Sequence, residues 1–253
     1  YSLRSLTGGD PLAVRVRRDT SGGAGDDDEE NFTVSQINSG ALTTFVGSGN
    51  NGHVSIWYDQ IGSNNLVQTT TGAQPLIVDS GSLFLNTDGK KGISIERSST
   101  RETKLDFTSG FTIANSHTFQ YLEFKRTFVD VLLSANGGGN IRIGRQSGTN
   151  LQIKNGGTQT FAAGITVHNN PFLYTTFLAA DGSASKVHIN GVEKQNTVYP
   201  DRDASQPNFA QIGKAGSNAS TPAFILSELL MYSSEQSNRA AIEANMDSKY
   251  SIF

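Results

Sequence analysis

Two aromatic rings stand next to two hydrogen-bonding side chains in the run Trp57, Tyr58, Asp59 and Gln60. Aromatic faces stack on sugar rings, and carboxylate or amide groups bond sugar hydroxyls. Together with Asn64 in the loop that follows, these residues are the candidate ligand-binding set, with a saccharide as the expected ligand. Large aromatic residues in strands are usually core residues, however. The alternative is that Trp57 fills the core while Asp59 and Gln60 bond backbone groups at the turn.

Five consecutive carboxylates occupy residues 26–30. Calcium prefers hard oxygen ligands, which makes Asp26, Asp28 and Glu30 the candidate metal ligands. Calcium loops space their ligands around a glycine turn, whereas this run is uninterrupted, so a solvated acidic segment is the competing interpretation. In that case the run pairs with the arginines at positions 15, 17 and 18. We expect no cofactor, with calcium at this run as the one exception to test.

Glycoside hydrolysis requires two carboxyl groups facing one cleft, roughly 5–10 Å apart. Glu123 and Glu228 both lie in strand-like segments and are the pair that fits best. Each can equally be a single charge on a solvated face or a buried acid bonded to a neighbouring arginine. The four histidines have no metal-ligand spacing, and the absence of cysteine excludes a thiolate nucleophile. We therefore predict no catalytic residue.

Composition narrows the classes of partner. The 253 residues carry a net charge of −3, and only 17% are charged. A weak negative balance predicts no nucleic-acid partner, and no apolar run approaches the ~18 residues that membrane insertion requires. Glycine is frequent, at 27 residues, and Asn, Ser and Thr separate short apolar runs. This composition favours strands joined by tight turns over helices.

The candidate residues are positioned by short alternating segments. We predict strands at residues 12–17, 54–58, 141–143, 151–154, 172–179, 186–189 and 224–232. Turns are expected at 146–150, at 181–183 and at Asn190-Gly191, which tolerates the positive φ angles of a type I′ hairpin. Helices are expected only at residues 39–46 and 234–249. The pattern predicts one all-β sandwich over residues 1–253, in which residues 1–50 supply a lead-in strand, the acidic loop and a short helix.

Six segments, in chain order, form a series that resembles the concanavalin A-like (laminin G-like) jelly-roll domains of phage virion proteins and bacterial surface proteins: residues 15–18, 31–33, 40–47, 57–60, 74–78 and 224–232. The Trp-Tyr-Asp-Gln signature also resembles one in the catalytic domain of the arabinofuranosidase B family. The resemblance implies a jelly-roll β-sandwich closed by a short C-terminal helix. It also implies a virion or extracellular, cell-surface location, with glycans or other surface proteins as partners and homo-oligomerisation as an open alternative.

This chain lacks the residues that would extend the resemblance to the catalytic site of the arabinofuranosidases. The arabinofuranosidases hold a catalytic Glu and Asp in cysteine-containing segments, and this chain has no cysteine. Ile61 also stands where the signature is commonly followed by serine. We therefore predict a non-enzymatic structural or adhesion module that binds glycans. The alternatives are a glycoside hydrolase of the arabinofuranosidase type and a decoration protein that serves only assembly.

Overall fold

Strand pairing organises the chain. The computed structural model describes residues 1–23, 25–96, 103–125, 130–135, 141–147, 150–155, 157–166, 168–179, 184–198, 208–213 and 223–253. Within these residues, hydrogen bonds join 18 strands into one network in which every strand pair is antiparallel. The predicted all-β sandwich with a C-terminal helix is confirmed.

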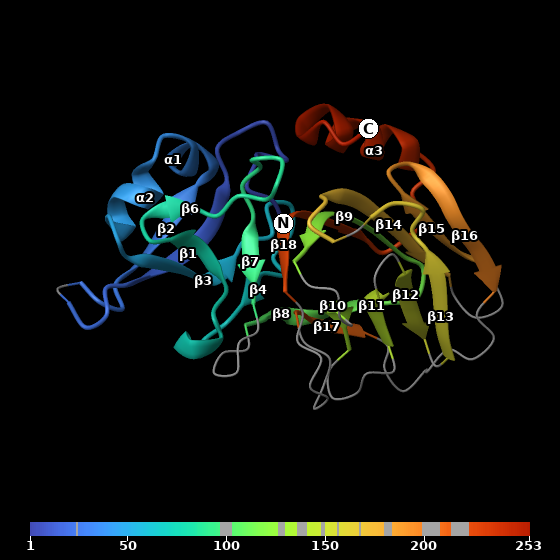
Figure 1. The fold of residues 1–253 in the computed structure, drawn as a ribbon, viewed down its shortest axis with the longest axis horizontal. Helices are drawn as coiled ribbons and strands as arrows, with labels where there is room; N and C mark the ends of the chain where they lie inside the picture. Colours follow the sequence, from blue (N-terminus) through green and yellow to red (C-terminus); the bar gives the residue numbers. More distant parts are fainter. Residues whose placement is uncertain are drawn as a thin grey trace.

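The network begins as one sheet and then splits into two. Strand β1 (Leu12–Asp19) lies between β2 (Glu29–Thr33) and β3 (Asn51–Trp57). The first half of β3 pairs with β5 (Leu76–Asp79), and its last two residues pair with β4 (Leu66–Val67). The two sheets that diverge from β3 become the two layers of the sandwich (Figure 1).

Each of the two layers continues from this point as a series of strands, each paired with the next. The first runs from β4 through β8 (Leu105–Thr112), β17 (Asn208–Ile212), β10 (Asp130–Ser134), β11 (Ile141–Ser147), β12 (Asn150–Asn155) and β13 (Gly157–Ala162). The second runs from β5 through β7 (Ile93–Ile95), β18 (Phe224–Tyr232), β9 (Ser116–Phe124), β14 (Phe172–Leu178), β15 (Ala184–Ile189) and β16 (Val192–Val198). A short β6 (Ser82–Leu83) pairs with β5, and a 3₁₀ turn spans Thr71–Ala73.

The main core fills the space between the layers and continues into the β1–β3 region. One cluster of buried side chains runs from Val14 and Trp57 to Ile153 and Phe172. Burying each large apolar side chain contributes about 1.5–3 kcal/mol. The apolar run at residues 224–232 forms β18 as predicted, between β7 and β9, and its first six residues are buried.

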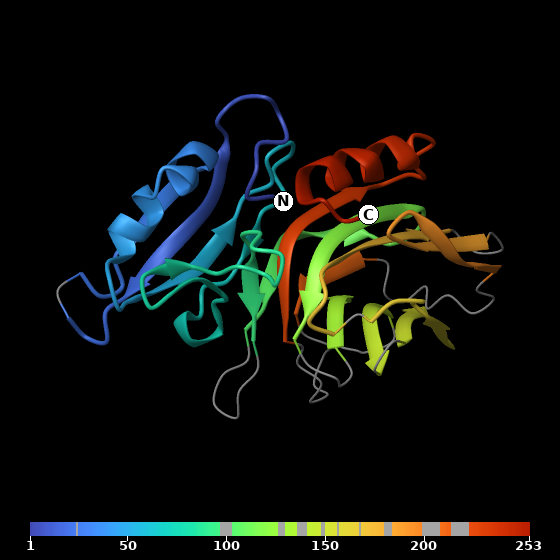
Figure 2. The same cartoon turned by 45° about the horizontal axis from the view of Figure 1, so that its top comes forward.

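Three short helices cover the sheets. Helices α1 (Val34–Asn38) and α2 (Ala41–Val46) lie over the β1–β3 region, and α3 (Arg239–Tyr250) lies on the outer face of the second layer (Figure 2). A second, smaller cluster holds α3 against that face, and its buried members are Phe119, Tyr121, Leu173, Met246 and Tyr250. No helix among the described residues is long and apolar enough to cross a membrane.

Two helix predictions need correction. The helix expected at residues 39–46 is α2, which begins at Ala41 because its N-cap Gly40 has a φ of 87°. Helix α1, at Val34–Asn38, was not predicted. The terminal helix begins at Arg239 rather than at 234, since the Gln236 N–H donates to His117 Nδ1 at 2.9 Å and holds the preceding chain against the sheet. Its buried face consists of Glu243, Met246 and Tyr250, and Lys249 is exposed.

The hairpin prediction is confirmed. Asn190 and Gly191 join β15 to β16 with φ angles of 49° and 75°, as a type I′ turn requires. Residues 141–143 and 151–154 lie in paired strands β11 and β12, also as predicted. The middle of the loop between them, residues 148–149, and the turn expected at 181–183 lie outside the described residues.

Candidate functional site

Trp57 ends β3 at the point where the two layers separate. Its neighbours are Val14 in β1 and Leu66 in β4, and its side chain is 1% exposed. The Tyr1 ring meets the indole edge to face, with ring centroids 6.0 Å apart. The interpretation of Trp57 as a core residue is confirmed, and its ring presents no face on which a sugar could stack.

Tyr58 points away from Trp57, as alternation along a strand requires. Its hydroxyl donates to Asn31 Oδ1 at 2.8 Å, on the β2 side of the sheet. Partial burial raises the pKa of this phenol above its ordinary value, and the Arg15 charge opposes the shift. Tyr58 therefore links β2 to the end of β3.

Asp59 organises the loop that follows. Its carboxylate accepts backbone hydrogen bonds from Ile61 at 3.1 Å, from Gly62 at 2.9 Å and from Asn64 at 3.3 Å. A Cβ at Gly62 would stand 2.6 Å from Asp59 Oδ2, so any larger residue at that position would force the carboxylate to shift. Asp59 thus bonds the backbone of its own turn, as the alternative interpretation predicts.

Gln60 fastens the beginning of the chain to this loop. Its Oε1 accepts from the Leu6 N–H at 2.9 Å, and its Nε2 donates to the carbonyls of Ser2 at 2.8 Å and Arg4 at 3.1 Å. Three backbone groups of residues 2–6 are therefore satisfied by one side chain. This role too is bonding of the backbone.

Asn64 connects the loop to the first layer. Its Oδ1 accepts from the Ser109 N–H at 2.8 Å and from Thr108 Oγ1 at 3.2 Å, both in β8. The Tyr1 hydroxyl donates to the Asn64 carbonyl. The loop at residues 59–64 is consequently held at both ends.

This loop forms one wall of a pocket of about 420 Å³. The facing wall is the end of β18, residues 229–232, with Phe111 of β8 beside it. A second hollow of about 330 Å³ shares four residues with the pocket and extends toward α3; the shared residues are Leu6, Ile61, Leu230 and Tyr232. The two hollows together are called the β18 groove, and the larger one lies within the ~300–1,000 Å³ range of small-ligand sites.

Three side chains in the β18 groove make no hydrogen bond to the backbone and are available to a ligand. Ile61 is 76% exposed at the rim. The Tyr232 ring packs edge to face on Phe119 with centroids 5.9 Å apart, and its hydroxyl has no hydrogen-bond partner within the described part of the chain. Ser63 is exposed and has no side-chain partner among the same residues. Burial raises the pKa of Tyr232, so its hydroxyl remains a neutral donor.

The structure brings two of the five candidate ligand residues, Asp59 and Asn64, to the groove and directs the other three elsewhere. Binding of a ligand by this set stays a prediction. Sequence reasoning missed Phe111 and Tyr232, which lie 50 or more residues from the signature in the printed sequence. The signal available for Tyr232 was its place as the aromatic end of the apolar run that forms β18.

The carboxylates considered for hydrolysis lie in separate hydrogen-bond networks. Glu228 is fully buried; its Oε2 lies 2.6 Å from Arg4 Nε and its Oε1 lies 2.8 Å from Arg4 Nη2. Ser2 Oγ and the Tyr250 hydroxyl also donate to Glu228, at 3.0 and 2.9 Å. This is the buried acid bonded to a neighbouring arginine that the sequence allowed.

Glu123 is equally buried and has its own partners. Its Oε1 lies 2.7 Å from Lys125 Nζ, and the Thr87 N–H donates to its Oε2 at 2.7 Å. The Thr87 hydroxyl donates to Oε1 as well. Neither this carboxylate nor Glu228 lines the β18 groove.

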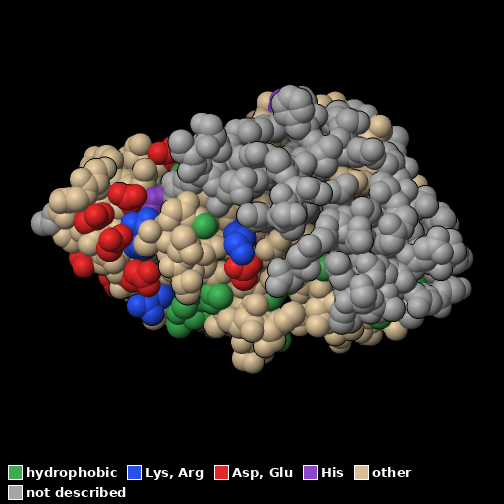
Figure 3. Space-filling model, turned by 90° about the horizontal axis from the view of Figure 1, so that it is seen from below, with side chains coloured by type: hydrophobic (Ala, Val, Ile, Leu, Met, Phe, Trp, Pro, Cys, Tyr) green, Lys and Arg blue, Asp and Glu red, His purple; other side chains and the backbone are tan. Residues whose placement is uncertain are grey.

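The acidic run pairs with the arginines of β1. The pairs Arg15–Glu29, Arg17–Asp27 and Arg18–Asp28 have N–O distances of 2.6, 2.7 and 2.6 Å. Acidic side chains gather at this end of the molecule, with basic side chains beside them (Figure 3). Pairing with the arginines, the competing interpretation, is confirmed.

Of the candidate calcium ligands, Asp28 binds Arg18 and Asp26 accepts the Thr20 N–H at 2.9 Å. Glu30 belongs to β2, where it pairs with Val16 of β1, and it is exposed. Across the described ranges no three acidic or histidine side chains come together as a metal site. Calcium binding here stays a prediction.

The sequence matches no protein-family model and no curated protein. The structure is similar to that of an arabinofuranosidase complexed with arabinofuranosyl-alpha-1,2-xylobiose, with a TM-score of 0.60 and 13% identity over 94% of this chain and 59% of that one. It is also similar to the receptor-binding domain of botulinum neurotoxin D, with a TM-score of 0.50 and 13% identity over 77% and 52% of the two chains.

The chain thus spans about 59% of the arabinofuranosidase that it matches. At this identity the likeness shows the fold alone, and the sandwich shared with an arabinofuranosidase is confirmed. Location on a virion or cell surface, adhesion and the lack of enzymatic activity stay predictions.

Proposed function

We propose that this chain is a non-enzymatic adhesion module that binds a saccharide in the β18 groove, displayed on a virion or cell surface. The observation that carries the proposal is the groove itself. It sets the half-buried aromatic residues Phe111 and Tyr232 against a rigid polar loop, which is the combination that sugar rings require.

The polar groups that a saccharide would meet are already oriented. Tyr232 and Ser63 offer hydroxyls without a partner within the described residues. Asp59 and Asn64 keep the loop in place through bonds to backbone groups, so little conformational freedom is lost on binding. The exposed Ile61 adds an apolar contact at the rim.

A glycan array followed by calorimetry with the retained glycan tests the proposal. We expect Ile61→Ala and Tyr232→Phe to weaken binding several-fold while the melting temperature stays within about 2 °C of the wild type. Val192→Ala is the matched control, because Val192 is also exposed, at 56%, but lies on the β15–β16 hairpin. Retention of no glycan, or unchanged affinity in both groove variants, would overturn the proposal.

Hydrolysis of the arabinofuranosidase type is the second candidate, favoured by the shared sandwich. Release of the aryl group from an aryl-arabinofuranoside measures it directly. The absence of turnover is expected, since Glu123 and Glu228 are each occupied by a cation and by hydroxyl donors away from the groove. The hydrolase function would replace the adhesion proposal if the wild type showed turnover and if Glu123→Gln or Glu228→Gln abolished it in protein that still melts cooperatively.

A further inference from the structure

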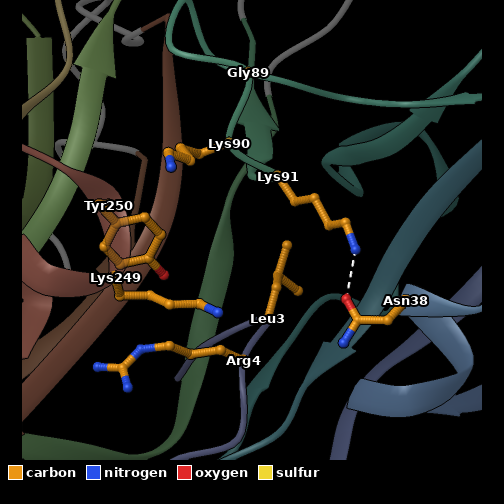
Figure 4. A pocket seen from close by; sticks show the side chains of 8 residues that line it. All are labelled: Leu3, Arg4, Asn38, Gly89, Lys90, Lys91, Lys249 and Tyr250. Carbon is orange, nitrogen blue, oxygen red and sulfur yellow. Dashed lines mark hydrogen bonds between the residues drawn. The ribbon is translucent and has the colours of Figure 1, made fainter.

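A second concave site shares Arg4 with the smaller hollow of the β18 groove. It has a volume of about 240 Å³, and basic side chains from three parts of the chain line it: Arg4, Lys90, Lys91 and Lys249. Leu3, Asn38, Gly89 and Tyr250 complete the lining of this lysine pocket. Lys91 and Lys249 reach into it from opposite sides, with Leu3 between them (Figure 4).

The charge of Arg4 is balanced within the fold. Its guanidinium makes two hydrogen bonds to Glu228, at 2.6 and 2.8 Å, and Nη2 also donates to Asn245 Oδ1 at 2.8 Å. Tyr250 donates to the same carboxylate. The excess charge of the lysine pocket therefore comes from its lysines.

The three lysines have no acidic partner within the described part of the chain. The acidic residues nearest to them in sequence are bonded elsewhere. Asp88 accepts the Tyr121 hydroxyl at 3.1 Å, and Asp247 accepts the N–H groups of Ile252 and Phe253 at 2.8 and 2.7 Å. Three positive charges thus line one small pocket without an ion-pair partner among the described residues.

Lys91 is the lysine whose charged form this arrangement destabilises. Its Nζ donates to Asn38 Oδ1 at 2.5 Å, which satisfies one proton but supplies no negative charge. Burial lowers the pKa of Lys91, and the positive charge of Lys249 lowers it further. An anion between the two ammonium groups would remove this repulsion and gain charge-assisted hydrogen bonds.

We propose that the lysine pocket binds one oxyanion group, a sulfate, phosphate or carboxylate, either free or carried by a saccharide. At about 240 Å³ it is smaller than a typical small-ligand site of ~300–1,000 Å³, so it suits a single charged group. Lysines act as movable point charges and accept several oxyanion geometries. The site does not depend on saccharide binding in the β18 groove.

Calorimetry at low ionic strength with three probes tests the proposal: sodium sulfate, a sulfated oligosaccharide and its unsulfated parent. We expect Lys91→Gln and Lys249→Gln each to weaken sulfate binding about tenfold, since each removes a charged donor. Lys194→Gln is the matched control, with the same change of charge on β16, outside the pocket. Without anion, Lys91→Gln should raise the melting temperature relative to Lys194→Gln, because it relieves repulsion.

The outcomes distinguish a free anion from one carried by a saccharide. They also distinguish the lysine pocket proposal from the β18 groove proposal. Binding of both sulfate and the sulfated saccharide supports a free-oxyanion site, and binding of the sulfated saccharide alone supports a saccharide-borne group. If neither binds, or if Lys91→Gln and Lys249→Gln bind as well as the wild type, the lysine pocket proposal is wrong. If the sulfated oligosaccharide and its unsulfated parent bind equally well, and neither lysine substitution changes their binding, the lysine pocket proposal is also wrong and the β18 groove is supported.

Discussion

Replacing Trp57 by alanine removes the side chain at the point where β3 passes from one layer to the other. Deletion of a fully buried large aromatic costs about 3–5 kcal/mol, and the edge-to-face contact with Tyr1 contributes about 0.5–1.5 kcal/mol of such a loss. Collapse of the cavity is restricted because both Val14 and Leu66 are fixed by strand pairing. We therefore expect a loss near the middle of the range, about 4 kcal/mol.

Urea unfolding followed by far-ultraviolet circular dichroism measures this loss. With a slope of roughly 3 kcal/mol per M, the midpoint should fall by about 1.3 M. Tyr58→Phe is the control, since it removes only the bond to Asn31 at the surface and should cost about 1 kcal/mol or less. In the wild type, Trp57 is the single tryptophan, so its fluorescence should be blue-shifted and protected from acrylamide until the protein unfolds.

The core assignment has a clear contrary result. If Trp57→Ala kept its urea midpoint within about 0.3 M of the wild type but lost glycan retention, the indole would be a binding surface. If the urea midpoint of Trp57→Ala falls, and only Ile61→Ala and Tyr232→Phe weaken glycan binding, then Trp57 stabilises the fold and the groove residues recognise the ligand.

Three further predictions follow from buried and surface charges. Glu228→Ala should lower the free energy of unfolding by about 3–5 kcal/mol in urea titrations, since it leaves Arg4 without its partner, and a loss below about 1 kcal/mol would contradict this. Burial lowers the pKa values of His117 and His188 to about 4, so the unfolded chain binds more protons between pH 6.5 and 4. Unfolding free energy should therefore fall as pH falls through that window, by at most about 3 kcal/mol per histidine, and His117→Gln should flatten the profile; an unchanged profile would exclude this cause. Asp28→Asn, which breaks a surface pair with Arg18, should cost about 1 kcal/mol or less at low salt and nothing measurable at 1 M salt.

Local patterns were sufficient for the fold class and for several of the strands. Short strand-like segments located β1, β3 and β14, the continuous apolar run located β18, and Asn190-Gly191 fixed one hairpin, because these signals depend on neighbours in sequence. The phase of α3 was not predictable in the same way. Glu243 is buried there beside Arg239, and a charged residue looks like a solvent-facing position until its partner is known.

The candidate site required long-range information. The signature residues specified hydrogen-bonding capacity, but not whether it would be directed to a ligand or to the chain itself. The Arg4–Glu228 pair joins residues 224 positions apart, and no spacing rule connects them. The wall formed by Phe111 and Tyr232 likewise becomes visible only when β8 and β18 are placed beside the loop.

The geometry gives the residues from Trp57 to Gln60 structural roles in this chain. Trp57 fills the space where the layers diverge, Asp59 closes the loop, and Gln60 fastens residues 2–6 to it. These bonds hold the chain together whether or not the β18 groove binds a ligand. Recognition must then depend on side chains that the fold leaves unoccupied, and those in the described part of the β18 groove include Ile61, Ser63 and Tyr232.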